Sequence, residues 1–335
     1  MLGAPTVAAR ALACGCALLI LLIGLVEPPS SASPLPGAGK VSRDGSYTVA
    51  TANIVVVEPA RKGSASGRLL PTVVWYPAVR AGAHVVPDRA NAPYPLLVFS
   101  TGYDIAVRVY QNLLSDWASA GFVVAAPTYP HNDPSDPGEV DENDIVNHPA
   151  DLRFVITALL ESAGRQTSVL SGLVDPNEVG VVGHSDGAEV SLAVADNSCC
   201  RDRRVKAAAV LSGAELASFG GSYFAGPSVP LLVVQGSADT VNSPECSTQI
   251  YDAASSPKYY LDLLGAGHET PYAGPQVVPA QARAVARVTT DFSEAELAGE
   301  RGGTAAMTTD GSVGRTARLT SDVSVPPALG KCPGA

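Results

Sequence analysis

Residues 179–190 of this chain read VGVVGHSDGAEV and place a serine where an apolar run meets a helix-forming segment. The stretch contains the pattern Gly-x-Ser-x-Gly at Gly183, Ser185 and Gly187. A serine held in a tight turn between a buried strand and a helix needs small residues two positions before and after it. Its hydroxyl then projects beside the first helical amides, where the helix dipole favours negative charge. The spacing predicts a nucleophilic Ser185, and the alternative is an ordinary glycine turn.

A serine hydroxyl is a weak nucleophile without a base, and of the five histidines only His268 follows Ser185 in the chain. Hydrolases built on such a turn carry nucleophile, acid and histidine in that order. The acid must therefore lie between the two, at the end of a strand. Asp239 follows the apolar run LLVVQG by a few residues and is the candidate. It would hold the tautomer of His268 and stabilise the imidazolium.

The negative oxygen that forms when a serine attacks a carbonyl needs two backbone N–H donors. One is expected from Asp186, the residue after the nucleophile. The other is expected from the loop that follows the apolar segment PLLVFS, which holds Thr101, Gly102 and Tyr103.

Composition limits the class of protein. The chain has 335 residues, of which 46% are hydrophobic and 16% charged, and its net charge is −10. A chain of this length and hydrophobic content can form the core of one large α/β domain. No cluster of lysines and arginines stands out, so we expect no nucleic-acid partner. The cysteines show no Cys-x-x-Cys spacing and have no histidine nearby, so we expect no metal and no cofactor.

Apolar runs and helical patterns alternate along the chain, which favours parallel β-α-β units. We therefore expect an α/β fold with a mostly parallel central sheet of about eight strands, flanked by helices and without a separate cap domain. The segments that predict strands are 47–57, 72–76, 95–100, 122–127, 178–183, 206–212, 230–236 and 258–264. Those that predict helices are 109–120, 149–163, 187–196 and 279–292.

The N-terminal segment has the features of a secretory signal. Arg10 precedes the apolar residues 11–26, and small residues follow. We expect a signal peptide over 1–32 and a secreted or cell-envelope protein; the alternative is an uncleaved membrane anchor, the one membrane contact that we expect. The other predicted parts are a flexible linker over 33–46, the folded domain over 47–296 and an extended C-terminal tail over 297–335.

Four cysteines remain outside the signal segment: Cys199, Cys200, Cys246 and Cys332. An even number in an exported chain predicts two disulfides, and four cysteines allow three pairings. Because adjacent cysteines rarely bond each other, we expect Cys199 and Cys200 each to pair with one of the two later cysteines.

The motifs GHSDG, GSADTVNSP and GAGHETPY together resemble those of the alpha/beta-hydrolase serine esterases. The resemblance runs from about residue 95 to 292. It is closest in kind to secreted bacterial cutinases and poly(ethylene terephthalate) hydrolases, and to chlorophyllase-like and platelet-activating-factor-acetylhydrolase-like esterases. It implies that Ser185, Asp239 and His268 are the catalytic residues and that Tyr103 supplies the second oxyanion N–H. Members of the group often have methionine where this chain has Asp186.

Together these features predict a monomeric serine carboxylester hydrolase that acts on small or lipid-like esters. Two other classes stay open. A hydrolase-fold binding protein without activity would not react at Ser185 with a fluorophosphonate. A peptidase or an acyltransferase would use the same three residues, but the short acidic loop between 127 and 149 predicts an open cleft that suits esters better than long peptides.

Overall fold

The computed structural model describes residues 45–61, 67–134, 139–273, 277–300, 302–323 and 332. The predicted signal peptide and all but the last two residues of the predicted linker lie outside these ranges. None of the described helices combines the length and the apolar character that a membrane span requires.

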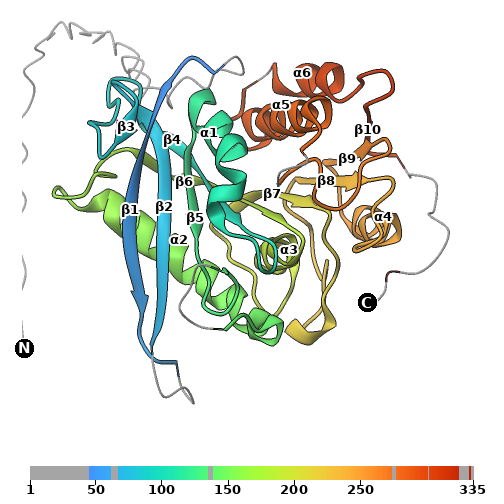
Figure 1. Ribbon diagram of the computed structural model, residues 1–335, viewed down its shortest axis with the longest axis horizontal. Helices are drawn as coiled ribbons and strands as arrows, with labels where there is room; N and C mark the ends of the chain where they lie inside the picture. Colours follow the sequence, from blue (N-terminus) through green and yellow to red (C-terminus); the bar gives the residue numbers. More distant parts are fainter. Residues whose placement is uncertain are drawn as a thin grey trace, which may run out of the picture. The chain divides into compact units, whose positions relative to one another are not determined.

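One sheet of ten strands runs through the described chain (Figure 1). The strands are β1 (Thr48–Glu58), β2 (Arg68–Ala78), β3 (Gly82–Ala83), β4 (Tyr94–Ser100), β5 (Val123–Pro127), β6 (Val174–His184), β7 (Val205–Leu211), β8 (Leu231–Gly236), β9 (Lys258–Leu263) and β10 (Ala317–Ser321). Their order in space is β10-β9-β8-β7-β6-β4-β5-β2-β1-β3. Strands β4 to β9 pair in parallel, whereas β2 runs antiparallel to both β1 and β5. The predicted α/β fold is confirmed, with ten strands instead of about eight.

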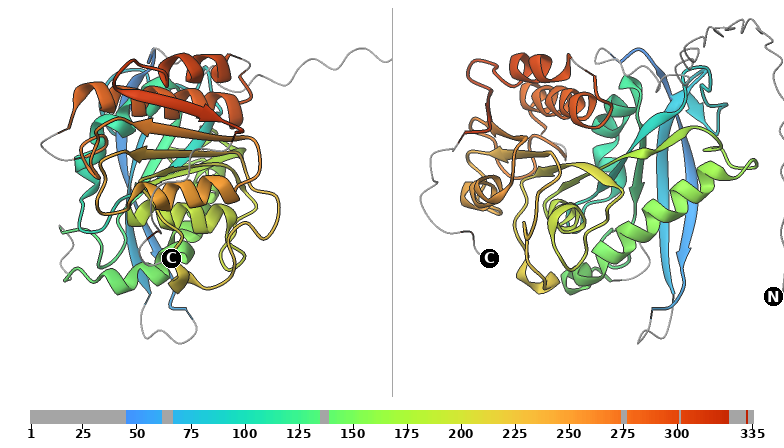
Figure 2. Two further views of the ribbon diagram at one scale, coloured as in Figure 1. Left: turned by 90° about the vertical axis from the view of Figure 1, so that its right-hand side faces the viewer. Right: turned by 180° about the vertical axis from the view of Figure 1, so that it is seen from behind.

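Helices cover both faces of the sheet (Figures 1 and 2). They are α1 (Gln111–Ala120), α2 (His148–Gly164), α3 (Asp186–Asp196), α4 (Pro244–Ala253), α5 (Pro279–Glu296) and α6 (Gly303–Asp310), with short 3-10 helices η1 (Val107–Tyr110), η2 (Glu142–Asn147) and η3 (Ala217–Phe219). Alternate residues of a strand point to opposite faces. In β4, Leu96 and Val98 therefore join a core with α2, α3 and α4, while Leu97 and Phe99 join a second core with α1, α5 and α6.

The predicted extended tail over 297–335 contains regular structure, which corrects the sequence prediction. Helix α6 buries Met307 in the second core, and β10 pairs antiparallel with β9, with Leu319 opposite Leu261. An edge strand exposes a row of unpaired backbone groups, and β10 supplies partners for those of β9.

The disulfide pairing also differs from the prediction. Cys199 bonds its neighbour Cys200, and Cys246 bonds Cys332. The first pair lies in the turn that follows α3, whereas Cys246 lies in the first turn of α4. In β-α-β units a helix starts at the carboxyl edge of the sheet and ends at the amino edge. The two sites therefore lie at opposite edges, and a bond between Cys246 and either adjacent cysteine is out of reach.

Candidate active site

Ser185 lies between the end of β6 and the start of α3, with φ 55° and ψ −127°. Such a positive φ is costly for a residue with a side chain and persists only where the surroundings impose it. Two close backbone contacts impose it here. A Cβ on Gly183 would lie 1.9 Å from the carbonyl oxygen of Gly187, and a Cβ on Gly187 would lie 2.1 Å from the carbonyl oxygen of Ser100. The turn therefore requires glycine at both positions.

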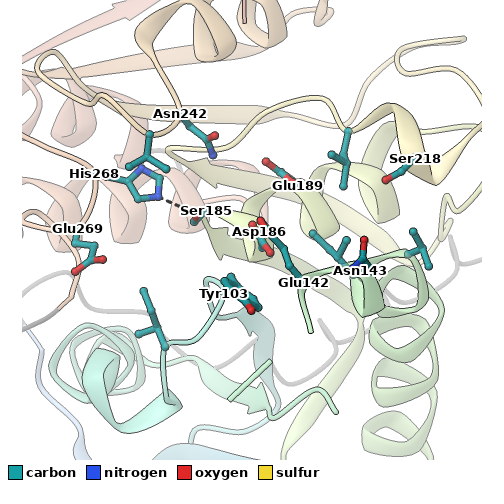
Figure 3. Close-up of a pocket in the computed structure, with 15 residues that line it drawn as sticks. Tyr103, Glu142, Asn143, Ser185, Asp186, Glu189, Ser218, Asn242, His268 and Glu269 are labelled. Carbon is teal, nitrogen blue, oxygen red and sulfur yellow. Dashed lines mark hydrogen bonds between the residues drawn. The ribbon is translucent and has the colours of Figure 1, made fainter. Parts of the chain in front are cut away.

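The structure brings Ser185, His268 and Asp239 into one hydrogen-bonded row. His268 Nε2 lies 2.8 Å from Ser185 Oγ (Figure 3). On the other side of the ring, His268 Nδ1 lies 2.8 Å from Asp239 Oδ2. Asp239 follows β8 and His268 follows β9, so the parallel strands deliver all three side chains to the carboxyl edge of the sheet. In a row of this kind the histidine can take a proton from the serine hydroxyl, and the carboxylate stabilises the imidazolium that forms.

Buried polar groups hold the carboxylate of Asp239. Its Oδ1 accepts a hydrogen bond from the N–H of Val241 at 2.9 Å, and its Oδ2 accepts one from Gln235 Nε2 at 3.2 Å. Ser247 in turn donates to Gln235 Oε1 at 2.5 Å. Asp239 is 4% exposed, and its two oxygens are oriented by these donors so that one faces His268.

The loop after β4 lies beside the nucleophile. A Cβ on Gly102 would lie 3.2 Å from Ser185 Cβ, so the chain passes Ser185 at the closest approach that glycine allows. The next residue, Tyr103, lines the same pocket as Ser185 and Asp186. The two predicted oxyanion donors therefore belong to segments that flank the Ser185 hydroxyl.

A pocket of about 520 Å³ opens at this row of residues, a size typical of small-molecule sites. Its apolar lining is Ile105, Ile145, Val146, Leu216 and Val241. Its polar lining, besides Ser185 and His268, is Tyr103, Glu142, Asn143, Asp186, Glu189, Ser218, Asn242 and Glu269 (Figure 3). Within the part of the chain that the structure describes, no lysine or arginine lines it. Among the described residues no group of histidine, cysteine and acidic side chains is placed to hold a metal ion.

Acidic groups in the pocket titrate at unusual pH. Burial raises the pKa of Asp186 to about 6, and the nearby carboxylate of Glu142 adds to the shift. Burial also raises the pKa of Glu189 well above its ordinary value, with Asp186 adding to it. Asp186 therefore gains its negative charge as the pH rises through about 6.

Two protein-family models match parts of this chain. The model described as Chlorophyllase matches residues 71–214, which include Ser185, and the model described as Serine hydrolase (FSH1) matches residues 169–280, which include all three residues of the row. The chain has the alpha/beta-hydrolase fold. A solved structure of a ferulic acid esterase from Streptomyces cinnamoneus has the same fold, with a TM-score of 0.60 and 23% identity. The alignment covers 79% of this chain and 94% of that chain. The comparison of this chain with curated proteins found no match.

These matches confirm the predicted enzyme class, a hydrolase of carboxylic esters. None of the three is to a cutinase or a poly(ethylene terephthalate) hydrolase. The narrower resemblance to those enzymes stays a prediction.

Sequence reasoning missed several side chains of the hydrolase that touch this site. Glu142 and Glu189 lie far apart in sequence and meet at the pocket only because η2 and α3 flank it. The ring of His184 contacts the His268 loop: its Nε2 lies 3.0 Å from the backbone carbonyl oxygen of His268. The one signal in the sequence was its position, directly before the serine.

Proposed function

We propose that this hydrolase cleaves carboxylic esters through a covalent acyl-enzyme, with Ser185 as nucleophile, His268 as base and Asp239 as the orienting acid. The observation that carries the proposal is the row of two 2.8 Å contacts at the wall of a pocket. Because the carboxylate of Asp239 can only accept, Nδ1 of His268 carries hydrogen, and Nε2 is then free to accept the Ser185 proton.

The reaction proceeds in two halves. Ser185 Oγ attacks the ester carbonyl carbon while its proton passes to His268 Nε2, and the N–H groups of Tyr103 and Asp186 stabilise the negative oxygen. His268 then gives the proton to the leaving alcohol, which departs. A water molecule, deprotonated by His268, attacks the acyl group, and Ser185 is released with the carboxylic acid.

The pocket supports a small ester with an apolar part as substrate. Its volume suits a drug-sized molecule, and its apolar lining faces its acidic groups. An aromatic ester of the ferulate kind, as the name of the structural neighbour suggests, fits this mixed lining, with a phenolic hydroxyl donating to a carboxylate. Short and aromatic acyl groups are therefore expected to react faster than palmitoyl.

Hydrolysis of p-nitrophenyl esters from acetate to palmitate, and of methyl ferulate, tests this function. Ser185→Ala is expected to reduce kcat by at least about 10³-fold because it removes the nucleophile, and Asp239→Asn by about 10²- to 10⁴-fold because it favours the wrong tautomer of His268. Ser218→Ala removes another serine hydroxyl from the same pocket and is expected to keep near wild-type activity. Equal activity in the Ser185 and Ser218 variants would rule out Ser185 as nucleophile.

We also propose that the protein is exported. The support is the apolar segment 11–26 together with two disulfides, which persist in oxidising compartments. Expression with the native N-terminus, followed by mass spectrometry of the protein in the medium, tests this. A product that begins near residue 33 is expected, and an intact N-terminus in the membrane fraction indicates an anchor instead.

A further inference from the structure

A second hydrogen-bonded row lies behind the proposed catalytic one, and its two side chains, Tyr110 and His184, are buried. The N–H of Gly102 donates to the hydroxyl of Tyr110 at 3.3 Å, and that hydroxyl lies 2.8 Å from His184 Nδ1. His184 Nε2 lies 3.0 Å from the backbone carbonyl oxygen of His268. Tyr110 is 1% exposed and His184 is 0% exposed, so water does not compete for these contacts.

The hydrogen positions in this row follow from its ends. The carbonyl of His268 can only accept, so His184 donates to it from Nε2. Burial lowers the pKa of His184 to about 3, with His268 nearby adding to the effect, so the ring is neutral. Nδ1 then accepts from the Tyr110 hydroxyl, whose oxygen accepts from Gly102. With the hydrogens placed in this way, each N–H or O–H donor of the row has an acceptor.

This row connects two loops that the sheet does not join directly. The Gly102 loop follows β4 and the His268 loop follows β9, and three strands, β6, β7 and β8, separate them. Aromatic contacts fix the middle of the row. The ring of His184 lies 4.7 Å from that of Tyr272 and 4.9 Å from that of His268, and Tyr110 packs on Phe99 at 4.8 Å.

We infer that Tyr110 and His184 are positioning residues that set the distance between the oxyanion-binding loop and the His268 loop on either side of Ser185. The inference rests on the proposed function. Gly102 directly precedes Tyr103, so the bond from its N–H to Tyr110 orients the peptide next to the proposed oxyanion donor. The bond from His184 holds the backbone of the proposed base. Displacement of either loop misaligns groups that act together in the transition state.

Tyr110→Phe tests the inference, because it removes one hydroxyl and keeps the ring. We expect kcat for p-nitrophenyl acetate to fall about 10- to 100-fold while KM changes less than about 3-fold, since oxyanion alignment matters in the transition state. Inhibition by an aryl trifluoromethyl ketone, which forms a tetrahedral adduct with the serine, is expected to weaken in parallel with kcat.

Tyr76→Phe is the matched control. Tyr76 is also fully buried, and its hydroxyl donates to the backbone carbonyl of Val85 at 2.8 Å, away from the pocket. We expect this variant to lower Tm by a similar amount and to leave kcat and ketone inhibition unchanged. If both tyrosine variants lose kcat equally, or if kcat falls only with the folded fraction, the positioning role is wrong.

His184→Phe adds a second, independent readout. Because Tyr110 and His184 belong to one row that either substitution interrupts, the double variant Tyr110→Phe/His184→Phe is expected to be no more than about 2-fold slower than His184→Phe alone, whereas independent effects would multiply. Multiplied losses overturn the inference. Wild-type protein that hydrolyses no ester overturns the proposed function and this inference together, whereas active wild type with a fully active Tyr110→Phe overturns only the inference.

Discussion

Asp186 combines two properties that conflict. Its N–H is a proposed donor to the negative oxygen of the intermediate, yet its own side chain is a carboxylic acid that lines the same pocket. Within the described residues its Oδ2 is buried and has no hydrogen-bond partner. Because burial raises its pKa to about 6, the side chain is neutral at acidic pH and negative above that. A negative charge next to a developing oxyanion raises the barrier.

Asp186→Asn should therefore change activity in a pH-dependent way. At pH 5 the carboxyl is mostly protonated, and the variant and the wild type are expected to have similar kcat. At pH 8 the wild type carries the charge and the variant does not, so the variant is expected to be about 3- to 10-fold faster. A pH–rate profile from 5 to 9 measures this, with Asp252→Asn on the exposed side of α4 as control. A constant ratio of the two rates across the profile would show that the charge has no effect.

The two disulfides constrain the chain very differently. Cys246 and Cys332 are separated by 86 positions, and their bond ties the first turn of α4 to Cys332, with Ala214 in the same buried cluster. Cys199 and Cys200 are neighbours, so their bond closes no long loop. In the chain-entropy view, a crosslink stabilises by restricting the unfolded state, and more so for longer loops.

The double variant Cys246→Ser/Cys332→Ser is therefore expected to lose about 2–4 kcal/mol of unfolding free energy. Cys199→Ser/Cys200→Ser is expected to lose less than about 1 kcal/mol, because there is almost no loop entropy to restore. Urea denaturation of the two double variants and the wild type, without reductant, measures the difference. Similar losses in both would mean that local contacts, and not loop closure, decide the contribution of each bond.

Negative charge dominates both the molecule and its pocket. The net charge is −10. Among the residues that the structure describes, the pocket is lined by four acidic side chains and by no lysine or arginine: Glu142, Asp186, Glu189 and Glu269. Fields of one sign in a cleft raise the local concentration of oppositely charged molecules and repel like charges.

Substrate charge should accordingly affect kcat/KM. Measuring kcat/KM for three acetate esters tests this: the cationic acetylcholine, its neutral isostere 3,3-dimethylbutyl acetate, and an ester whose alcohol ends in a carboxylate. At low ionic strength the anionic ester is expected to be at least about 10-fold poorer than the neutral one, and the gap should narrow in 0.5 M salt. The substitutions Glu142→Gln and Glu269→Gln are also expected to reduce the difference in kcat/KM between the neutral and the anionic ester. Equal rates for the neutral and anionic esters would exclude an electrostatic contribution of the pocket.

Much of the fold was predictable from local patterns. The eight predicted strands correspond to β1, β2 and β4 to β9, and the four predicted helices correspond to α1, α2, α3 and α5. These elements have long apolar runs or clear helical periods. The strand β10 and the helix α6 were missed because their segments are short and rich in threonine, glycine and alanine, and they are stabilised by contacts with β9 and α5.

The sequence by itself determined the fold class and the candidates Ser185, Asp239 and His268. A tight glycine turn is recognised from neighbouring residues, and the acid and the histidine are recognised from their order along the chain. Only the tertiary structure decided which cysteines pair, which acids share the pocket, and that Tyr110 and His184 link the two loops. Each of these depends on distances between segments far apart in the sequence. Packing across the sheet sets those distances, and no local pattern encodes them.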